Sequence, residues 1–408
     1  MTRLLLKDEL LDMQLLRAVC SASFGGADLG ECLVTSGRID ESNLDSWFVE
    51  WTHIADEVTR LAEREEAAGN LESARLAYFR ASTYHRTAGV MALDAPLDPK
   101  LVRSNASHTE TFRRAAALLA LPPELLEIPW QGVTLPGYFF RAADDGAARA
   151  TVILTGGYDS TCEELYFWNG AAALARGYNV LAFDGPGQGG ALIQRGLPLR
   201  ADWESVVTPV LDYALRRSDV DPRRVALIGL SLGGHLAPRA VSVEHRFAAC
   251  IADCGSFDLY ASFLSRLPRP LAQAFAGGRG WARSVVGWIL GRLARKPTAG
   301  WALRRGQLVH GVESPLAFVD TLRQFSLAGH ASRITCPTLV CSAEGDDISA
   351  SAAELVAALT CPKEHMRFSN ADGAAGHCEQ GARTLYHART FAWLDALLTP
   401  RTPSRAVA

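Results

Sequence analysis

A serine stands between two glycines where an apolar run meets a helical pattern. The segment Gly229-Leu-Ser-Leu-Gly233 directly follows the run 225–228 and directly precedes a helical stretch. A turn this tight between a strand and a helix strains the backbone at the serine, so the residues two before and two after it must be small. Such a turn projects the hydroxyl at the edge of a sheet. This context predicts that Ser231 is a nucleophile.

A serine hydroxyl needs a base near neutral pH, and the base needs a carboxylate that orients it. A glycine-rich loop before the last helical stretch holds one histidine, His377, which is the predicted base. Between serine and histidine, an expected strand at 338–342 leads into Ala343-Glu-Gly-Asp-Asp347. We expect Asp346 rather than Asp347 to orient the histidine, because in turns of this kind the acid stands two residues after the glutamate. The order serine, acid, histidine is that of a nucleophile-elbow enzyme.

Attack by a serine on a carbonyl creates an oxyanion, which backbone N–H groups usually stabilise. Leu232, directly after the nucleophile, is expected to supply one N–H. The loop Thr155-Gly-Gly-Tyr-Asp159 should supply the other, with Gly157 as the first choice and Tyr158 as the second. The same loop can also cap a helix through Asp159 or Ser160, and the two interpretations are compatible.

The nine cysteines of the chain do not form a clear metal-binding pattern. Cys250 and Cys254 are four residues apart, and Cys336 and Cys341 are five apart, in apolar runs without neighbouring histidines. A zinc site is the alternative, but buried small apolar side chains are the expectation, with no metal and no other cofactor. The first residues interrupt their apolar run with charges after three positions, which is not typical of a signal peptide. Reduced thiols and a cytoplasmic location are therefore expected.

Charge and hydrophobicity restrict the possible partners. A formal net charge of −3 argues against a protein that binds nucleic acid through a basic face. No apolar stretch reaches the roughly 18 uninterrupted residues that a membrane span needs. With 48% hydrophobic residues the chain can bury a large core. We expect a protein that acts on a small molecule and contacts neither nucleic acid nor membrane.

The elements that must position these residues are short runs rich in Val, Ile and Leu, separated by helical stretches. The runs lie at 128–141, 150–154, 179–183, 225–229, 248–253 and 338–342. This rhythm is typical of βαβ units and predicts an α/β fold with a mostly parallel sheet. The interval 256–332 breaks the rhythm with helical sequence. As an insertion it would lie over the carboxyl edge of the sheet, where α/β proteins place their sites.

The first 120 residues show helical spacing and no period-two alternation. Helical patterns cover 44–68, 71–93 and 107–121. The predicted organisation is a helical domain over 1–123 and a catalytic domain over 124–408, which carries a helical lid insertion at about 256–332.

Four motifs together carry a family resemblance. They are Gly156-Gly-Tyr-Asp-Ser-Thr-Cys-Glu-Glu164, Phe183-Asp-Gly-Pro-Gly-Gln-Gly189, Gly229-Leu-Ser-Leu-Gly-Gly234 and Gly373-Ala-Ala-Gly-His-Cys378. They resemble motifs of the α/β-hydrolases, in particular of the dihydroxy-pseudo-oxynicotine hydrolases, and equally those of the fungal polyketide-shortening hydrolases of pigment biosynthesis. The resemblance covers about residues 45–398 and implies an α/β-hydrolase fold.

The resemblance also implies an activity, namely hydrolysis of a carbon–carbon bond beside a ketone without a metal. Carried over, Ser231 is the nucleophile, His377 the base and Asp346 the orienting acid. The resemblance further implies a homodimer, and a glutamate of the loop-to-helix motif, Glu163 or Glu164, that helps to hold substrate. Tyr158 in the same motif is a further candidate for substrate binding.

Other functions remain open. An ester or thioester hydrolase, or an acyltransferase or cyclase, would share the acyl-enzyme step. A ligand-binding protein on a hydrolase scaffold belongs to a different class, and the retained set of nucleophile, acid and base argues against it. Cleavage of a carbon–carbon bond needs a polar group directed at the leaving fragment. Glu163 and Glu164 are predicted to supply it; alternatively, their charges complement a helix N-terminus.

Overall fold

The computed structural model describes residues 4–93 and 97–398. Residues 399–408, the end of the range assigned to the catalytic domain, lie outside the described part.

An eight-stranded sheet forms the centre of the molecule, in the order β1-β2-β4-β3-β5-β6-β7-β8. The strands are β1 (Glu124–Trp130), β2 (Val133–Phe140), β3 (Arg149–Thr155), β4 (Asn179–Phe183), β5 (Val220–Gly229), β6 (Ala249–Asp253), β7 (Thr338–Ala343) and β8 (Lys363–Phe368). Strand β2 runs antiparallel to β1 and β4, and all other pairs are parallel. The predicted mostly parallel α/β sheet is confirmed.

Helices cover both faces of the sheet. They are α6 (Cys162–Leu165), η2 (Tyr166–Gly170), α7 (Ala171–Leu174), α8 (Gly189–Ile193), α9 (Glu204–Leu215), α10 (Gly233–Val241), η5 (Asp347–Ser349), α16 (Ala352–Ala358), η6 (His377–Glu379) and α17 (Arg383–Leu398). Successive strand residues point to opposite faces. In β3, Val152 and Leu154 join the core that contains α7 and α17, whereas Ile153 joins the core that contains α9, α10 and α16. Burial on both faces explains why the strands are continuous apolar runs.

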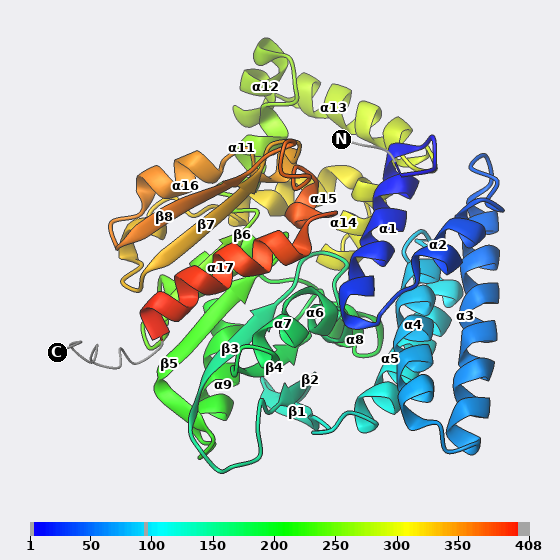
Figure 1. The fold of residues 1–408 in the computed structure, drawn as a ribbon. Helices are drawn as coiled ribbons and strands as arrows, with labels where there is room; N and C mark the ends of the chain where they lie inside the picture. Colours follow the sequence, from blue (N-terminus) through cyan, green and yellow to red (C-terminus); the bar gives the residue numbers. More distant parts are fainter. Residues whose placement is uncertain (1–3, 94–96, 399–408) are drawn as a thin grey trace.

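Five helices and a 3₁₀ turn precede the sheet and lie together beside it (Figure 1). They are α1 (Glu9–Cys20), η1 (Ser21–Phe24), α2 (Leu29–Ser36), α3 (Leu44–Ala67), α4 (Leu71–Gly89) and α5 (Pro99–Ala117). The sequence pattern predicted the last of these at 107–121, but the helix begins at Pro99, because Asp98 caps it by accepting a hydrogen bond from the Lys100 N–H.

The hydrophobic core is continuous between these helices and the sheet. Phe79 of α4 stacks on Tyr166 of η2, with ring centroids 5.3 Å apart. Phe112 of α5 meets Tyr138 of β2 edge to face at 5.2 Å. The N-terminal helices therefore bury their apolar faces against the body that carries the strands. The division at residue 123 stays a prediction.

The interval between β6 and β7 is helical, as the sequence predicted. It contains α11 (Leu259–Leu264), α12 (Arg269–Ala276), α13 (Gly280–Ala294), α14 (Trp301–His310), α15 (Pro315–Thr321), η3 (Leu322–Gln324) and η4 (Ala331–Arg333). Helices α12 and α13 lie at one extremity of the molecule, and α14 and α15 lie nearer its centre (Figure 1). Within the described ranges, every helix is too short or too polar to cross a membrane.

Candidate active site

The turn between β5 and α10 holds Ser231 in a strained conformation. Its φ angle is 59°, a left-handed value that residues other than glycine rarely adopt. The flanking glycines have no space for a side chain. A Cβ at Gly229 would lie 1.9 Å from the Gly233 carbonyl oxygen, and a Cβ at Gly233 would lie 2.5 Å from that of Thr155. The local sequence thus dictates this turn, as expected for a nucleophile elbow.

The structure brings Ser231, His377 and Asp346 into one hydrogen-bonded chain. His377 Nε2 lies 2.9 Å from Ser231 Oγ, and His377 Nδ1 lies 3.0 Å from Asp346 Oδ2. A Nδ1–H that donates to the carboxylate leaves Nε2 free to accept the serine hydroxyl. Asp347 is exposed and makes no contact with the His377 ring. The arrangement suits a nucleophile, a base and an orienting acid.

Neighbouring donors keep Asp346 ionised. Its carboxylate accepts a hydrogen bond from the Ile348 N–H at 3.1 Å and from the Cys254 thiol at 3.0 Å. Burial opposes the charge on Asp346, but His377 and these donors hold its pKa below the usual 3.8. Burial likewise opposes a charge on His377, whereas Cys378 and Asp346 raise the pKa of the imidazole well above 6.5.

Two thiols adjoin the histidine. Cys254 Sγ lies 3.3 Å from Cys378 Sγ and 3.5 Å from His377 Nδ1. The expectation that the Cys250–Cys254 pair lacks a histidine neighbour is therefore wrong for Cys254. Cys254, His377 and Cys378 are close enough together to hold a metal ion.

A second such group consists of Cys162, Glu163 and Asp184. All three side chains are buried. Asp184 is already engaged, because it accepts hydrogen bonds from the backbone N–H groups of Cys162 and Gly190, both at 2.7 Å. The absence of a metal from the enzyme stays a prediction.

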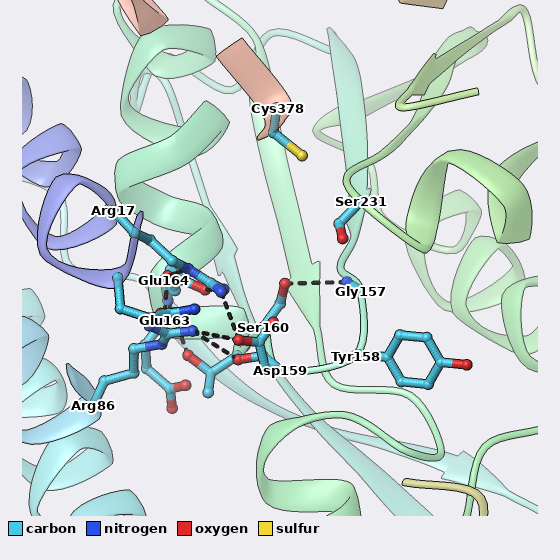
Figure 2. Close-up of polar contacts among 12 residues, drawn as sticks. Arg17, Arg86, Gly157, Tyr158, Asp159, Ser160, Glu163, Glu164, Ser231 and Cys378 are labelled. Atoms are coloured by element: carbon cyan, nitrogen blue, oxygen red, sulfur yellow. Dashed lines mark hydrogen bonds and ion pairs between the residues drawn. The ribbon is translucent and has the colours of Figure 1, made fainter. Parts of the chain in front are cut away.

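The two predicted oxyanion donors lie close together beside Ser231, since a Cβ on Gly157 would stand 3.0 Å from the Leu232 nitrogen. The Leu232 N–H makes no hydrogen bond within the described residues. Gly157 lies against the nucleophile, since a Cβ on it would stand 2.7 Å from Ser231 Cβ. However, the Gly157 N–H donates to Ser160 Oγ at 3.1 Å (Figure 2). A substrate oxygen must displace the Ser160 hydroxyl from Gly157, or use instead the N–H of Tyr158, which makes no backbone hydrogen bond in the described part of the chain.

Ser231 opens on a chamber of about 260 Å³ between the sheet edge and the helical insertion. Its walls are mostly apolar and include Leu259, Phe263, Trp301, Leu303, Phe318, Leu322 and Ile348. Tyr158 also lines it, and the Tyr158 hydroxyl bonds His310 Nε2 at 2.8 Å. Substrate binding by Tyr158 stays a prediction. Such a chamber fits an apolar small molecule.

The two glutamates of the loop-to-helix motif make buried contacts away from this chamber. Glu163, 3% exposed, accepts a hydrogen bond from the Tyr138 hydroxyl at 3.0 Å. Glu164, 7% exposed, binds the Arg17 guanidinium through two hydrogen bonds of 2.7 and 2.6 Å. Neither lines the chamber, although Glu164 borders a small cavity shared with Ser231 and His377. A contact of either glutamate with a leaving fragment therefore stays a prediction.

Residues that sequence analysis did not identify surround the oxyanion loop. Arg17 of α1 and Arg86 of α4 both bind Asp159 Oδ2, at 2.6 and 3.2 Å (Figure 2). Arg305 of α14 donates from Nε to the Tyr158 carbonyl at 3.1 Å. No local signal identifies these arginines, because each comes from a helix distant in the chain. The position of Cys254 could have been recognised from the sequence, because this residue directly follows β6 at the carboxyl edge of the sheet.

Comparisons with known proteins agree with this geometry. The model of the "Alpha/beta hydrolase family" matches residues 152–385. The chain is 35% identical over 406 residues to the 20-hydroxy-prefusarin hydrolase FUS2 of Gibberella moniliformis, with 95% of this chain and 96% of that protein covered. It is 31% identical over 413 residues to the hydrolase acrC of Aspergillus aculeatus, covering 94% and 95%.

Among solved structures, the crystal structure of the 2,6-dihydroxy-pseudo-oxynicotine hydrolase superposes with a TM-score of 0.72. The match covers 94% of this chain and 95% of that one, at 22% sequence identity, and shows a shared fold that includes the N-terminal helices. Family model, relatives and fold agree with the resemblance seen in the motifs. The chain belongs to the alpha/beta hydrolase family and is a hydrolase.

Proposed function

We propose that this hydrolase cleaves a carbon–carbon bond beside a ketone in an aromatic or polyketide-like small molecule of secondary metabolism. The observation that carries the proposal is the hydrogen-bonded chain Ser231–His377–Asp346, whose serine lines an apolar chamber. The motifs that resemble the dihydroxy-pseudo-oxynicotine hydrolases support the reaction class. The similarity to a hydrolase named for 20-hydroxy-prefusarin supports a secondary metabolite as substrate.

In the proposed reaction, Ser231 Oγ adds to the ketone carbon while its proton passes to His377 Nε2. The N–H of Leu232 and one N–H of the loop after β3, that of Gly157 or Tyr158, stabilise the oxyanion. The carbon–carbon bond then breaks, its electron pair delocalises into the leaving fragment, and His377 returns the proton. Water activated by His377 releases the acyl group from Ser231. Asp346 holds the imidazole in the required tautomer throughout.

An ester or thioester hydrolase, or an acyltransferase or cyclase, is the second candidate. One observation favours it: Glu163 and Glu164, which were expected to assist a carbon leaving group, are engaged in buried contacts. A homodimer and a cytoplasmic location stay predictions.

Turnover of a β-diketone, an aryl ketone and an activated aryl ester by the parent enzyme and two serine variants tests the proposal. Ser231→Ala should lose roughly 10³-fold or more in kcat on every substrate, because nucleophile and base act as a unit. Ser265→Ala, at an exposed helix end outside the chamber, is the matched control. Near-parent turnover by Ser231→Ala would refute the covalent mechanism. Rapid ester turnover without ketone cleavage would establish the second candidate.

A further inference from the structure

Cleavage of a β-dicarbonyl places a requirement on the chamber. When the carbon–carbon bond breaks, its electron pair moves onto the second carbonyl oxygen, and the fragment leaves as an enolate. A donor that contacts this oxygen lowers the barrier, whereas an ester leaving group needs less help. Since Glu163 and Glu164 do not line the chamber, another donor must face it.

Most polar side chains in the chamber wall already have partners inside the protein. The Tyr158 hydroxyl bonds His310, the Ser256 hydroxyl donates to the Ile348 carbonyl at 2.9 Å, and the Ser262 hydroxyl donates to the Asp258 carbonyl at 2.8 Å. These hydroxyls are already engaged inside the protein, whereas an enolate oxygen is best stabilised by a donor without a partner.

Arg305 differs from them. The residue lines the chamber together with Ser231 and also borders a small cavity with Arg86 and Asp159, although it is only 4% exposed. Nε donates to the Tyr158 carbonyl, which fixes the guanidinium one residue away from the oxyanion loop. Within the described residues, the two terminal nitrogens of Arg305 make no hydrogen bond and no ion pair. A buried guanidinium with unused donors is costly unless a ligand completes it.

The charges around Arg305 increase the cost of leaving its donors without a ligand. The buried cluster beside the loop contains the three arginines Arg17, Arg86 and Arg305 but only two carboxylates, Asp159 and Glu164. Burial, together with the charges of Arg86 and Arg17, lowers the pKa of Arg305 to about 10 despite the attraction of Asp159. The guanidinium stays protonated near neutral pH, and the cluster keeps one uncompensated positive charge.

The surrounding insertion is also basic. Residues 259–312 contain nine arginines and lysines and no aspartate or glutamate, in a chain whose net charge is −3. Arg266 of this segment and the carboxylate Asp347 lie exposed at the chamber wall. The excess of positive charge in the insertion attracts anionic molecules toward the chamber.

We propose that Arg305 binds the second carbonyl oxygen of a β-dicarbonyl substrate and stabilises the enolate that leaves. This inference rests on the proposed function. Ser231 Oγ forms a bond to the first carbonyl carbon, the bond to the central carbon breaks, and its electrons reach the oxygen held by Arg305. The imidazolium of His377 then protonates the central carbon, and water hydrolyses the acyl-enzyme. The chamber thereby favours substrates that carry an acidic β-dicarbonyl.

A titration without turnover tests the proposal directly. Benzoylacetone, whose enolate has an absorption band distinct from the neutral form, is bound to Ser231→Ala and the pH is varied. A charge-assisted hydrogen bond to the enolate should move the appearance of this band at least about one pH unit below its position for free benzoylacetone. Adding Arg305→Met to Ser231→Ala should abolish the shift. Adding Arg279→Gln, an exposed arginine of the insertion outside the chamber lining, should preserve it.

Turnover measurements distinguish a role of Arg305 as a hydrogen-bond donor to the substrate from a role as a structural support of the Tyr158 loop. In the otherwise unchanged enzyme, Arg305→Met should reduce kcat for benzoylacetone cleavage at least about tenfold more than kcat for aryl ester hydrolysis. Arg305→Lys should restore part of that ratio. No spectral shift in Ser231→Ala, a shift that persists without Arg305, or equal losses on both substrates would overturn the proposal. If the parent enzyme cleaves no ketone, the proposed function fails, whereas the titration still decides whether Arg305 binds the enolate.

Discussion

Replacement of Glu164 by glutamine should destabilise the protein, because this carboxylate joins an N-terminal helix to the loop beside the nucleophile. Arg17 of α1 binds both Glu164 oxygens, at 2.7 and 2.6 Å, and Arg86 of α4 approaches to 3.4 Å. Glutamine keeps one acceptor oxygen but directs an amide N–H₂ at a buried guanidinium. Asp159 would then be the one carboxylate that compensates the charges of both arginines.

The size of the effect follows from these contacts. Removing one partner of a buried ion pair costs about 3–5 kcal/mol. Asp159 still lies 2.6 Å from Arg17 and 3.2 Å from Arg86, so we expect a value near the lower limit, about 3 kcal/mol. For a chain of 408 residues, an unfolding entropy on the order of 0.9 kcal/mol/K converts this loss into a Tm decrease of about 3–4 °C.

The assay is urea unfolding followed by tryptophan fluorescence, with Arg17→Met, Glu164→Gln and the double variant forming a mutant cycle. Glu72→Gln is the matched control, because the Glu72 side chain that pairs with Arg75 is exposed, and such pairs contribute less than about 1 kcal/mol. A cost for Glu164→Gln no larger than that of the control, or additive effects in the cycle, would refute the reasoning. Ketone and ester turnover should decrease together, since the variant disturbs the shared loop.

Three further predictions concern the site and its support. Gly157→Ala should reduce kcat/KM about 100-fold or more on all substrates while leaving the far-ultraviolet spectrum unchanged, because its Cβ would stand 2.9 Å from Ser231 Oγ; parent-level turnover would contradict the close approach. Cys378 and Asp346 outweigh burial and raise the pKa of His377, so kcat/KM should fall on acidification with a midpoint above pH 6.5. Asp346→Asn should move this midpoint to lower pH and reduce kcat by about 10⁴-fold. An unmoved midpoint would assign the ionisation to another group. Deletion of residues 1–120 should give insoluble or inactive protein, because Phe79 and Phe112 belong to the core that also contains the sheet; a soluble, fully active truncation would contradict this.

Local sequence was enough to predict the turn at Ser231 and the mostly parallel sheet that carries it. The elbow at Ser231 depends on glycines two residues away, and steric exclusion over five residues leaves a visible pattern. The strands are short apolar runs because both faces of the sheet are covered, and this too is a local signal. The start of α5 was missed, because its cap at Asp98 precedes a polar stretch whose burial depends on other helices.

The surroundings of the nucleophile depended on the tertiary structure. Arg17 and Glu164 are 147 residues apart, and Arg305 meets the Tyr158 carbonyl across the same separation. No periodicity links such positions, because a contact between distant segments leaves no repeat in either of them. The sequence by itself determined a serine elbow at the carboxyl edge of a parallel sheet, since strand, turn and helix propensities act over a few residues. Only the packing of the N-terminal helices and the insertion around that edge decided which groups the two glutamates contact. The same packing placed the buried Arg305 at the chamber.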